Sequence, residues 1–120
     1  MKKGRHFHAC SLFEEKIYVV AGVGAENHVE YFSLASQTWE DSVSVAPTLP
    51  VSTYGGQLMV LDGSLTFISG YNNKKIFKFV KIIWNSYTHY EWEEVGELKN
   101  ARNHFQLLRW NVTDCTNWNV

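Results

Sequence analysis

The sequence has few cysteines, no excess of charge of either sign and no long apolar run. Its two cysteines, Cys10 and Cys115, are too few for a disulfide framework, so we expect two reduced thiols and leave a pair between them open. Eleven basic and twelve acidic residues give a net charge of -1, without the basic excess that nucleic-acid binding needs. The longest apolar runs, such as 17–23, are far shorter than a membrane span. We therefore expect neither nucleic acid nor membrane as a partner.

The start of the sequence also lacks a secretory signal. Lysines and then Gly4–His6 follow Met1, where a signal peptide would have an apolar segment. We therefore expect a cytoplasmic location. Asn111–Thr113 matches the glycosylation sequon, but without a signal peptide it is favoured as a chance triplet.

Residues that favour β-strands dominate what is present. Seven Phe, six Tyr and five Trp make up 15% of the chain, and hydrophobic residues make up 45% against 19% charged. Aromatic and β-branched residues are enriched in strands, and this composition is not that of a disordered chain. A length of 120 residues corresponds to about one domain. The composition therefore indicates an all-β protein.

Two similar segments lie 48 residues apart. Lys16–Gly22 and Ser64–Gly70 are each a short apolar run that ends in a small residue and a glycine. Another apolar stretch and a turn precede each run, and Asp62–Gly63 between two apolar runs is a strong hairpin signal. A polar loop and a third run follow, Val29–Phe32 in the first unit and Ile76–Phe79 in the second. The pattern predicts an internal repeat.

Each unit closes with a tryptophan, Trp39 in the first and Trp92 in the second. The spacing from the third run differs between the units, and we interpret residues 85–89 as extra residues in a hairpin loop. A register that uses Trp84 in place of Trp92 stays open. Each unit then has four short strands, and a third copy begins at Ala101–Phe105.

This order of elements resembles the kelch repeat, which forms one four-stranded blade of a β-propeller from about 50 residues. Lys16–Gly22, Val29–Phe32 with Thr38–Trp39, and Trp92–Val95 carry the resemblance. It implies an all-β partial β-propeller with about two four-stranded kelch blades plus the first strand of a third. We divide the chain into residues 5–50 (repeat 1), 51–100 (repeat 2) and 101–120 (start of a third repeat and an irregular tail).

Two features depart from the family pattern. Ala21–Gly22 and Ser69–Gly70 stand in place of a double glycine, where only small residues are needed, and Thr53 stands where Arg5 opens the first unit. Propellers have about four to eight blades, so two to three blades leave apolar faces open. We hypothesise a piece of a longer propeller, with self-association through the exposed blade faces as the alternative.

The resemblance implies a protein-interaction module without catalysis or cofactor. Adaptor kelch proteins serve cullin-type ubiquitin ligases through a BTB domain, which is not visible here, so a role as substrate adaptor is an inference from the family. The family binds peptides just after the glycine pair and at the start of the first strand. The matching residues are Arg5, Tyr54, Tyr71, Asn72, Asn73 and Arg102. Arginine pairs with carboxylates and tyrosine is a frequent hot-spot residue, whereas the alternative is that both arginines tie adjacent blades together.

A metal site is the competing interpretation. On a strand His6, His8 and Cys10 would share one face, and imidazole and thiolate suit zinc or copper. With Glu14 they resemble the cupin motif, although the spacing differs and no second histidine motif follows. The alternative function is therefore a small cupin-like metal-dependent β-barrel enzyme that uses His6 and His8.

Overall fold

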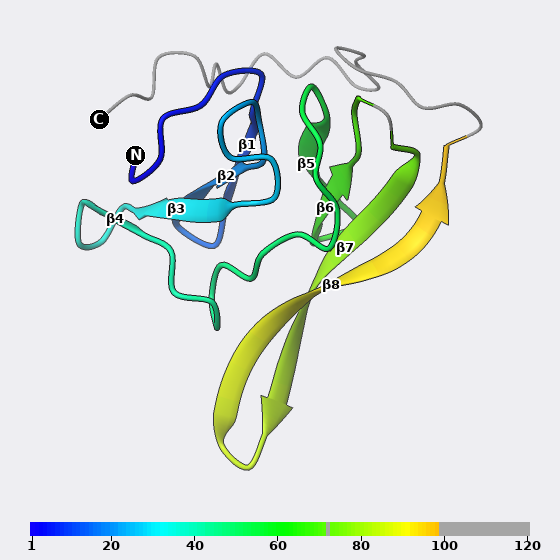
Figure 1. The fold of residues 1–120 in the computed structure, drawn as a ribbon. Coiled ribbons are helices and arrows are strands. Elements are labelled where there is room, and N and C mark those ends of the chain that lie inside the picture. Colours follow the sequence, from blue (N-terminus) through cyan, green and yellow to red (C-terminus); the bar gives the residue numbers. More distant parts are fainter. Residues whose placement is uncertain (72, 99–120) are drawn as a thin grey trace.

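The computed structural model describes residues 1–71 and 73–98, and all of its regular structure is β-strand (Figure 1). The strands are β1 (Ala9–Phe13), β2 (Lys16–Val20), β3 (Val29–Ser33), β4 (Thr38–Glu40), β5 (Gln57–Leu61), β6 (Ser64–Ile68), β7 (Lys75–Trp84) and β8 (Tyr87–Glu97). They form two antiparallel sheets in chain order, β1-β2-β3-β4 and β5-β6-β7-β8, here called blade 1 and blade 2. Within the described ranges no helix could cross a membrane. The predicted all-β class and four strands per unit are confirmed.

Tight two-residue turns close the hairpins. Glu14–Glu15, Asp62–Gly63 and Asn85–Ser86 have positive φ at both positions, between 48° and 78°. Such turns match the twist of the flanking strands, which is why Asp-Gly is a strong hairpin signal. The hairpin predicted at Asp62–Gly63 is confirmed.

The third and fourth strands of blade 2 form a long twisted ribbon that projects beyond the sheet (Figure 1). The expected loop over residues 85–89 is wrong, because only Asn85 and Ser86 form the turn and Tyr87 begins β8. Cross-strand pairs such as Ile82 with His89 extend the ladder through residues that look turn-like by themselves. Phe79 pairs with Trp92, so Trp92 is confirmed in the fourth strand.

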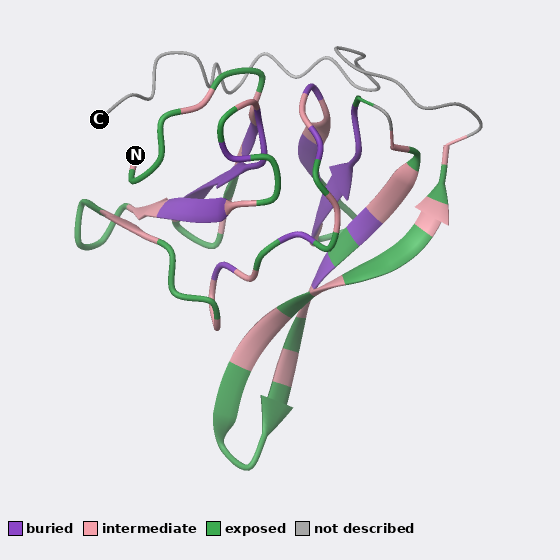
Figure 2. Ribbon diagram, viewed as in Figure 1, coloured by how far each residue is buried: buried purple, intermediate pink, exposed green. Residues whose placement is uncertain are grey.

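The two blades pack face to face, with their first strands β1 and β5 next to each other. The core lies between the sheets, where the ring of Phe79 contacts Tyr18 at 5.2 Å and Phe13 at 6.3 Å between centroids. Buried segments concentrate where the blades meet, and the ribbon tip is exposed (Figure 2). Val19 and Val20 are both buried although they lie on opposite faces of β2, as expected for stacked blades.

The connector between the blades seals the outer part of this interface. The Trp92 Nε1–H donates to the Pro47 carbonyl at 2.9 Å, and the Tyr90 backbone N–H donates to the Ser44 carbonyl at 2.9 Å. The late tryptophan thus joins the two blades with a hydrogen bond as well as with apolar area.

The described sheets are not closed into a ring. The third repeat expected over 101–120, including Arg102 and Asn111, and the expected contact residue Asn72 lie outside the described residues. Cys10 is disulfide-bonded, so the expectation of a reduced thiol is wrong at this position.

Candidate functional site

The segments that lead into β1 and β5 make equivalent backbone hydrogen bonds at one end of the blades. The Val23 N–H donates to the His6 carbonyl at 2.8 Å, and the Tyr71 N–H donates to the Tyr54 carbonyl at 2.8 Å. Both pairs tie a first-strand entry to the loop after the second strand, and they are 48 residues apart in sequence. This end is where the family resemblance places binding residues.

Close backbone approach at this end requires glycine. A Cβ on Gly70 would overlap the Tyr54 carbonyl oxygen, and a Cβ on Gly22 would lie 2.9 Å from the His6 carbonyl oxygen. The interpretation of Ala21–Gly22 and Ser69–Gly70 as a close-approach position is therefore confirmed at the glycine of each pair.

Four rings lie in a row across the two entry segments and the loop after β6, and we call them the aromatic ladder: His6, Phe7, Tyr54 and Tyr71. Tyr54 and Tyr71 stack with centroids 4.7 Å apart and planes 12° apart. Phe7 continues the stack onto Tyr54 at 6.2 Å, and His6 meets Phe7 edge-on at 5.0 Å. Tyr54 and Tyr71 were both predicted as contact residues from the sequence. The structure places their rings in contact although they are 17 positions apart in the chain.

Phe7 is the residue of the ladder that sequence reasoning missed. Its φ is 56°, in the left-handed region, and its equivalent 48 positions later is Gly55 with φ 74°. A left-handed conformation costs a non-glycine residue roughly 1–2 kcal/mol. The Gly55 N–H donates to the Phe7 carbonyl at 2.8 Å and holds this geometry, while the side chain stays 50% exposed. Aligning the two units residue by residue would have found a phenylalanine at a glycine position.

Of the two predicted asparagines, Asn73 lies within the described residues, and it hydrogen-bonds to the backbone of its own loop. The Asn73 Oδ1 accepts the Lys75 N–H at 2.9 Å, and the Asn73 N–H donates to the Gly70 carbonyl at 3.3 Å. Asn73 thus fixes the loop that carries Tyr71, which is 49% exposed.

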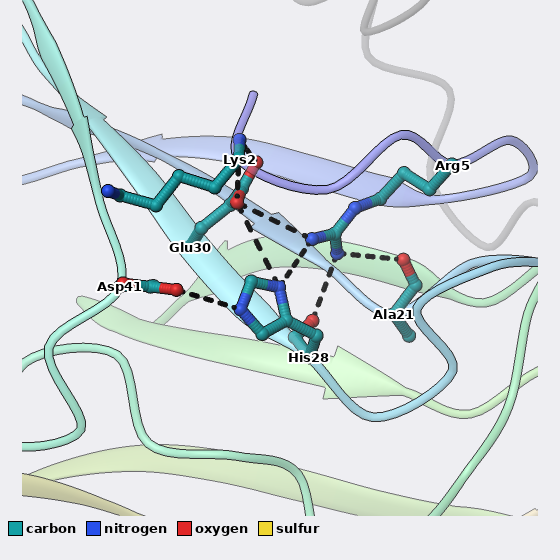
Figure 3. Close-up of polar contacts among 6 residues, drawn as sticks. All are labelled: Lys2, Arg5, Ala21, His28, Glu30 and Asp41. Carbon is teal, nitrogen blue, oxygen red and sulfur yellow. Dashed lines mark hydrogen bonds and ion pairs between the residues drawn. The ribbon is translucent and has the colours of Figure 1, made fainter.

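Arg5 is held inside blade 1 by a buried polar network (Figure 3). Its Nη1 donates to the Ala21 and His28 carbonyls, both at 3.0 Å, and its Nη2 lies 2.6 Å from His28 Nδ1. Nη2 also lies 3.7 Å from Glu30 Oε2, and the side chains of Arg5 and Glu30 are both 0% exposed. The arginine therefore ties the entry segment to the β2–β3 loop of its own blade.

Charge and hydrogen bonding order the rest of this network. Burial lowers the pKa of Arg5 from its ordinary value, and the nearby Glu30 charge opposes that change. Glu30 also accepts the Lys2 backbone N–H with both carboxylate oxygens at 3.1 Å. Because arginine only donates, His28 Nδ1 accepts from Arg5, and Nε2–H donates to Asp41 Oδ2 at 3.2 Å. The network fixes the backbone from which His6 and Phe7 project.

The structure does not support the arrangement that suggested a metal site. The left-handed φ of Phe7 interrupts the strand alternation, β1 begins only at Ala9, and Cys10 is disulfide-bonded. Across 1–71 and 73–98 no group of three or more His, Cys, Asp or Glu side chains is placed to hold a metal ion. The cupin-like barrel is wrong as a fold, because the described strands form two separate open sheets.

Two stacked four-stranded sheets, each with its first strand inside and a tryptophan in the last strand, define a blade-repeat protein of the β-propeller type. The kelch motif matches residues 4–44, which are blade 1 with its entry segment. The chain thus carries a kelch repeat, and the resemblance to the kelch-repeat family is confirmed. No curated protein matches the chain. Kelch repeats generally mediate protein–protein interaction and are typically non-enzymatic, and the motif supports a kelch-repeat interaction module.

Proposed function

We propose that this kelch module recognises an extended segment of a protein partner on the aromatic ladder, and that it carries out no catalysis. The observation that carries the proposal is Phe7, a half-exposed ring held at a strained, glycine-like φ in line with the stacked Tyr54 and Tyr71. Strain that persists at an exposed position is characteristic of functional sites, because the surrounding structure must hold it in place.

The chemistry of the ladder suits apolar and cationic side chains of a peptide. Ring faces accept cationic and apolar groups, and tyrosine hydroxyls add hydrogen bonds at the rim. Tyr54 and Tyr71 are the direct contacts in this proposal, Arg5 and Asn73 position the loops around them, and Asn72 and Arg102 remain predicted contacts. Tyrosine and arginine are enriched among residues that dominate binding energy.

The family also suggests a wider setting for the module. We place the chain as part of a larger propeller, with repeats over 5–50 and 51–100 and a third beginning in 101–120. The larger protein would act in the cytoplasm as a substrate adaptor of a cullin-type ubiquitin ligase through a domain outside this sequence. Co-purification of a cullin with the full-length protein tests this setting, and its absence would leave only the peptide-binding role.

A peptide library displayed on phage and selected on the purified protein tests the ladder itself. Tyr71→Ala should weaken the selected peptides about 30-fold or more, the loss expected for a hot-spot residue worth about 2 kcal/mol. Tyr87→Ala is the matched control, because Tyr87 is similarly exposed but lies at the ribbon tip. Equal binding by the two variants would refute the ladder as the site.

Phe7→Gly separates the backbone from the ring. Glycine accepts the left-handed φ without strain, so the fold should be kept or slightly stabilised, while peptide affinity falls. A variant that binds as well as the parent would remove Phe7 from the site.

A further inference from the structure

The side of blade 1 that points away from blade 2 is buried along part of its length. Tyr18 packs against blade 2, so Ile17 and Val19 on either side of it point outward. Cys10 pairs with Val19 and points outward as well. We call these three residues the outer face, and they are 7% (Ile17), 1% (Val19) and 8% (Cys10) exposed. Leu12 also points outward from β1, and its 51% exposure shows a residue of this side without cover. A further segment therefore packs over the outer face.

The described chain supplies cover at one edge of this side. The Lys2 N–H donates to both carboxylate oxygens of Glu30, and Arg5 Nη2 lies 3.7 Å from one of them. Glu30 pairs with Val19 from β3, whereas Cys10 pairs with Val19 from β1. The N-terminal residues thus account for burial beside β3, and the burial of Cys10 needs a segment on the β1 side.

Cys10 itself identifies that segment. It is disulfide-bonded, and the sequence has one other cysteine, Cys115, which lies outside the described residues. Within one chain the bond can therefore only join Cys10 to Cys115, and a bond between the Cys10 residues of two copies is the alternative. Disulfide-bonded residues have Cα atoms about 4.4–6.8 Å apart, so an intrachain bond would bring the residues around Cys115 directly over β1.

The chain beyond the described strands is long enough to reach this side and apolar enough to cover it. Cys115 is 17 residues after Leu98, and an extended chain of that length spans at most about 55–60 Å, more than the longest dimension of the molecule, 40 Å. Leu108, Trp110 and Val112 alternate with polar residues, which is the pattern of an extended segment with one apolar side. Residues 108–115 therefore combine an apolar surface with the cysteine that the outer face requires.

We propose that a disulfide between Cys10 and Cys115 holds residues 108–115 against the outer face of blade 1. The contact uses other residues than the aromatic ladder and does not depend on peptide binding there. In a larger propeller the outer face would take another blade, so the oxidised chain and the propeller are mutually exclusive arrangements on this side.

Closing the bond requires an oxidant, and oxidised glutathione can supply it. The bond between the Sγ atoms of Cys10 and Cys115 forms, the disulfide of glutathione breaks, and the two thiol protons end on two molecules of reduced glutathione. Cytosolic thiols are kept reduced, so in the cytoplasm the segment would be fixed only on oxidation, whereas an oxidising compartment would keep it fixed.

Peptide mapping of the full chain tests the pairing without any substitution. The purified protein is equilibrated with reduced and oxidised glutathione, free thiols are alkylated, and trypsin is added without reductant. Cleavage after Arg5, Lys16 and Arg109 releases residues 6–16 and 110–120. These two peptides should be recovered as one cross-linked species that separates on reduction. A 6–16 peptide linked to a second copy of itself, or Cys10 that is alkylated even in the most oxidising buffer, would overturn the proposal.

Limited trypsin digestion of the folded protein tests the cover. Cleavage after Arg109 should be roughly tenfold faster in Cys115→Ser than in the oxidised parent, because proteolysis follows the population of the released segment. Thr116→Ser is the matched control, since it changes the next residue, keeps both cysteines and should be cleaved as slowly as the parent. Equal cleavage of Cys115→Ser and the oxidised parent would refute the cover and leave the outer face to another blade or a second copy.

The same variant separates this proposal from peptide binding. Cys115→Ser should bind the peptides selected on the ladder as the parent does, and a loss of that binding would contradict the independence of the two sites. Circular dichroism checks that the variant is folded. Peptide mapping of the parent decides the pairing even if Cys115→Ser does not fold.

Discussion

We expect Arg5→Met to lower the free energy of unfolding more than Glu30→Gln, the corresponding change at the carboxylate that pairs with Arg5. Arg5→Met keeps much of the side-chain volume but removes the positive charge beside Glu30, whose side chain is 0% exposed. Glu30 is then left with the Lys2 backbone N–H, at 3.1 Å, as its remaining close donor in the described network. A buried charge would lose its compensating partner.

The expected loss is about 3–5 kcal/mol, the cost of breaking a buried ion pair from one side. Domains of this size have a total stability of about 5–15 kcal/mol, so the variant loses a large part of it. Glu30→Gln should cost less, because Arg5 keeps the Ala21 and His28 carbonyls and His28 Nδ1 as acceptors. The double variant, Arg5→Met with Glu30→Gln, should be more stable than the sum of the single changes implies.

Urea denaturation followed by tryptophan fluorescence measures all three variants. The midpoint should fall in the order parent, Glu30→Gln, Arg5→Met, with little change in the slope m. The reasoning fails if Arg5→Met costs less than about 1 kcal/mol, the range of an exposed ion pair, or if Glu30→Gln is the more damaging change.

Two further predictions concern a buried tyrosine and a strained turn. Burial raises the pKa of Tyr18 well above its ordinary value, so the folded state still holds the phenol proton at a pH where the unfolded chain has lost it. The free energy of unfolding is therefore retained below pH about 10 and falls as the pH rises beyond it. Tyr18→Phe should flatten this alkaline decline in urea midpoints measured from pH 8 to 11, and an unchanged decline would contradict the assignment. Ser86→Gly should raise the melting temperature by relieving about 1 kcal/mol of strain at φ 66°, and a lower melting temperature would show that the turn depends on the serine side chain.

The strand order was predictable because its signals are local. Asp62–Gly63 between apolar runs specifies a hairpin by turn geometry, and Lys16–Gly22 and Ser64–Gly70 mark the second strand of each unit by composition. Trp92 was placed in the fourth strand by repetition of the order of elements, and its pairing with Phe79 confirms that placement.

The errors arose where cross-strand or long-range contacts overrode local preference. Tyr87–His89 follow a turn and have polar neighbours, yet pairing with Ile82 and Ile83 keeps them in a strand. His6 and His8 were expected on one face, but the backbone contact from Gly55 holds Phe7 at a positive φ and breaks the alternation. Neither contact is encoded within a single short window of sequence.

The sequence by itself determined that the chain is all-β and built from repeated four-strand units, because turn residues and apolar spacing act over a few positions. Only the tertiary structure decided the use of individual side chains. It turned Arg5 inward to Glu30 and aligned Phe7 with Tyr54 and Tyr71. The physical reason is that charge burial and ring stacking depend on distances between segments far apart along the chain, and those distances exist only once the two blades have packed.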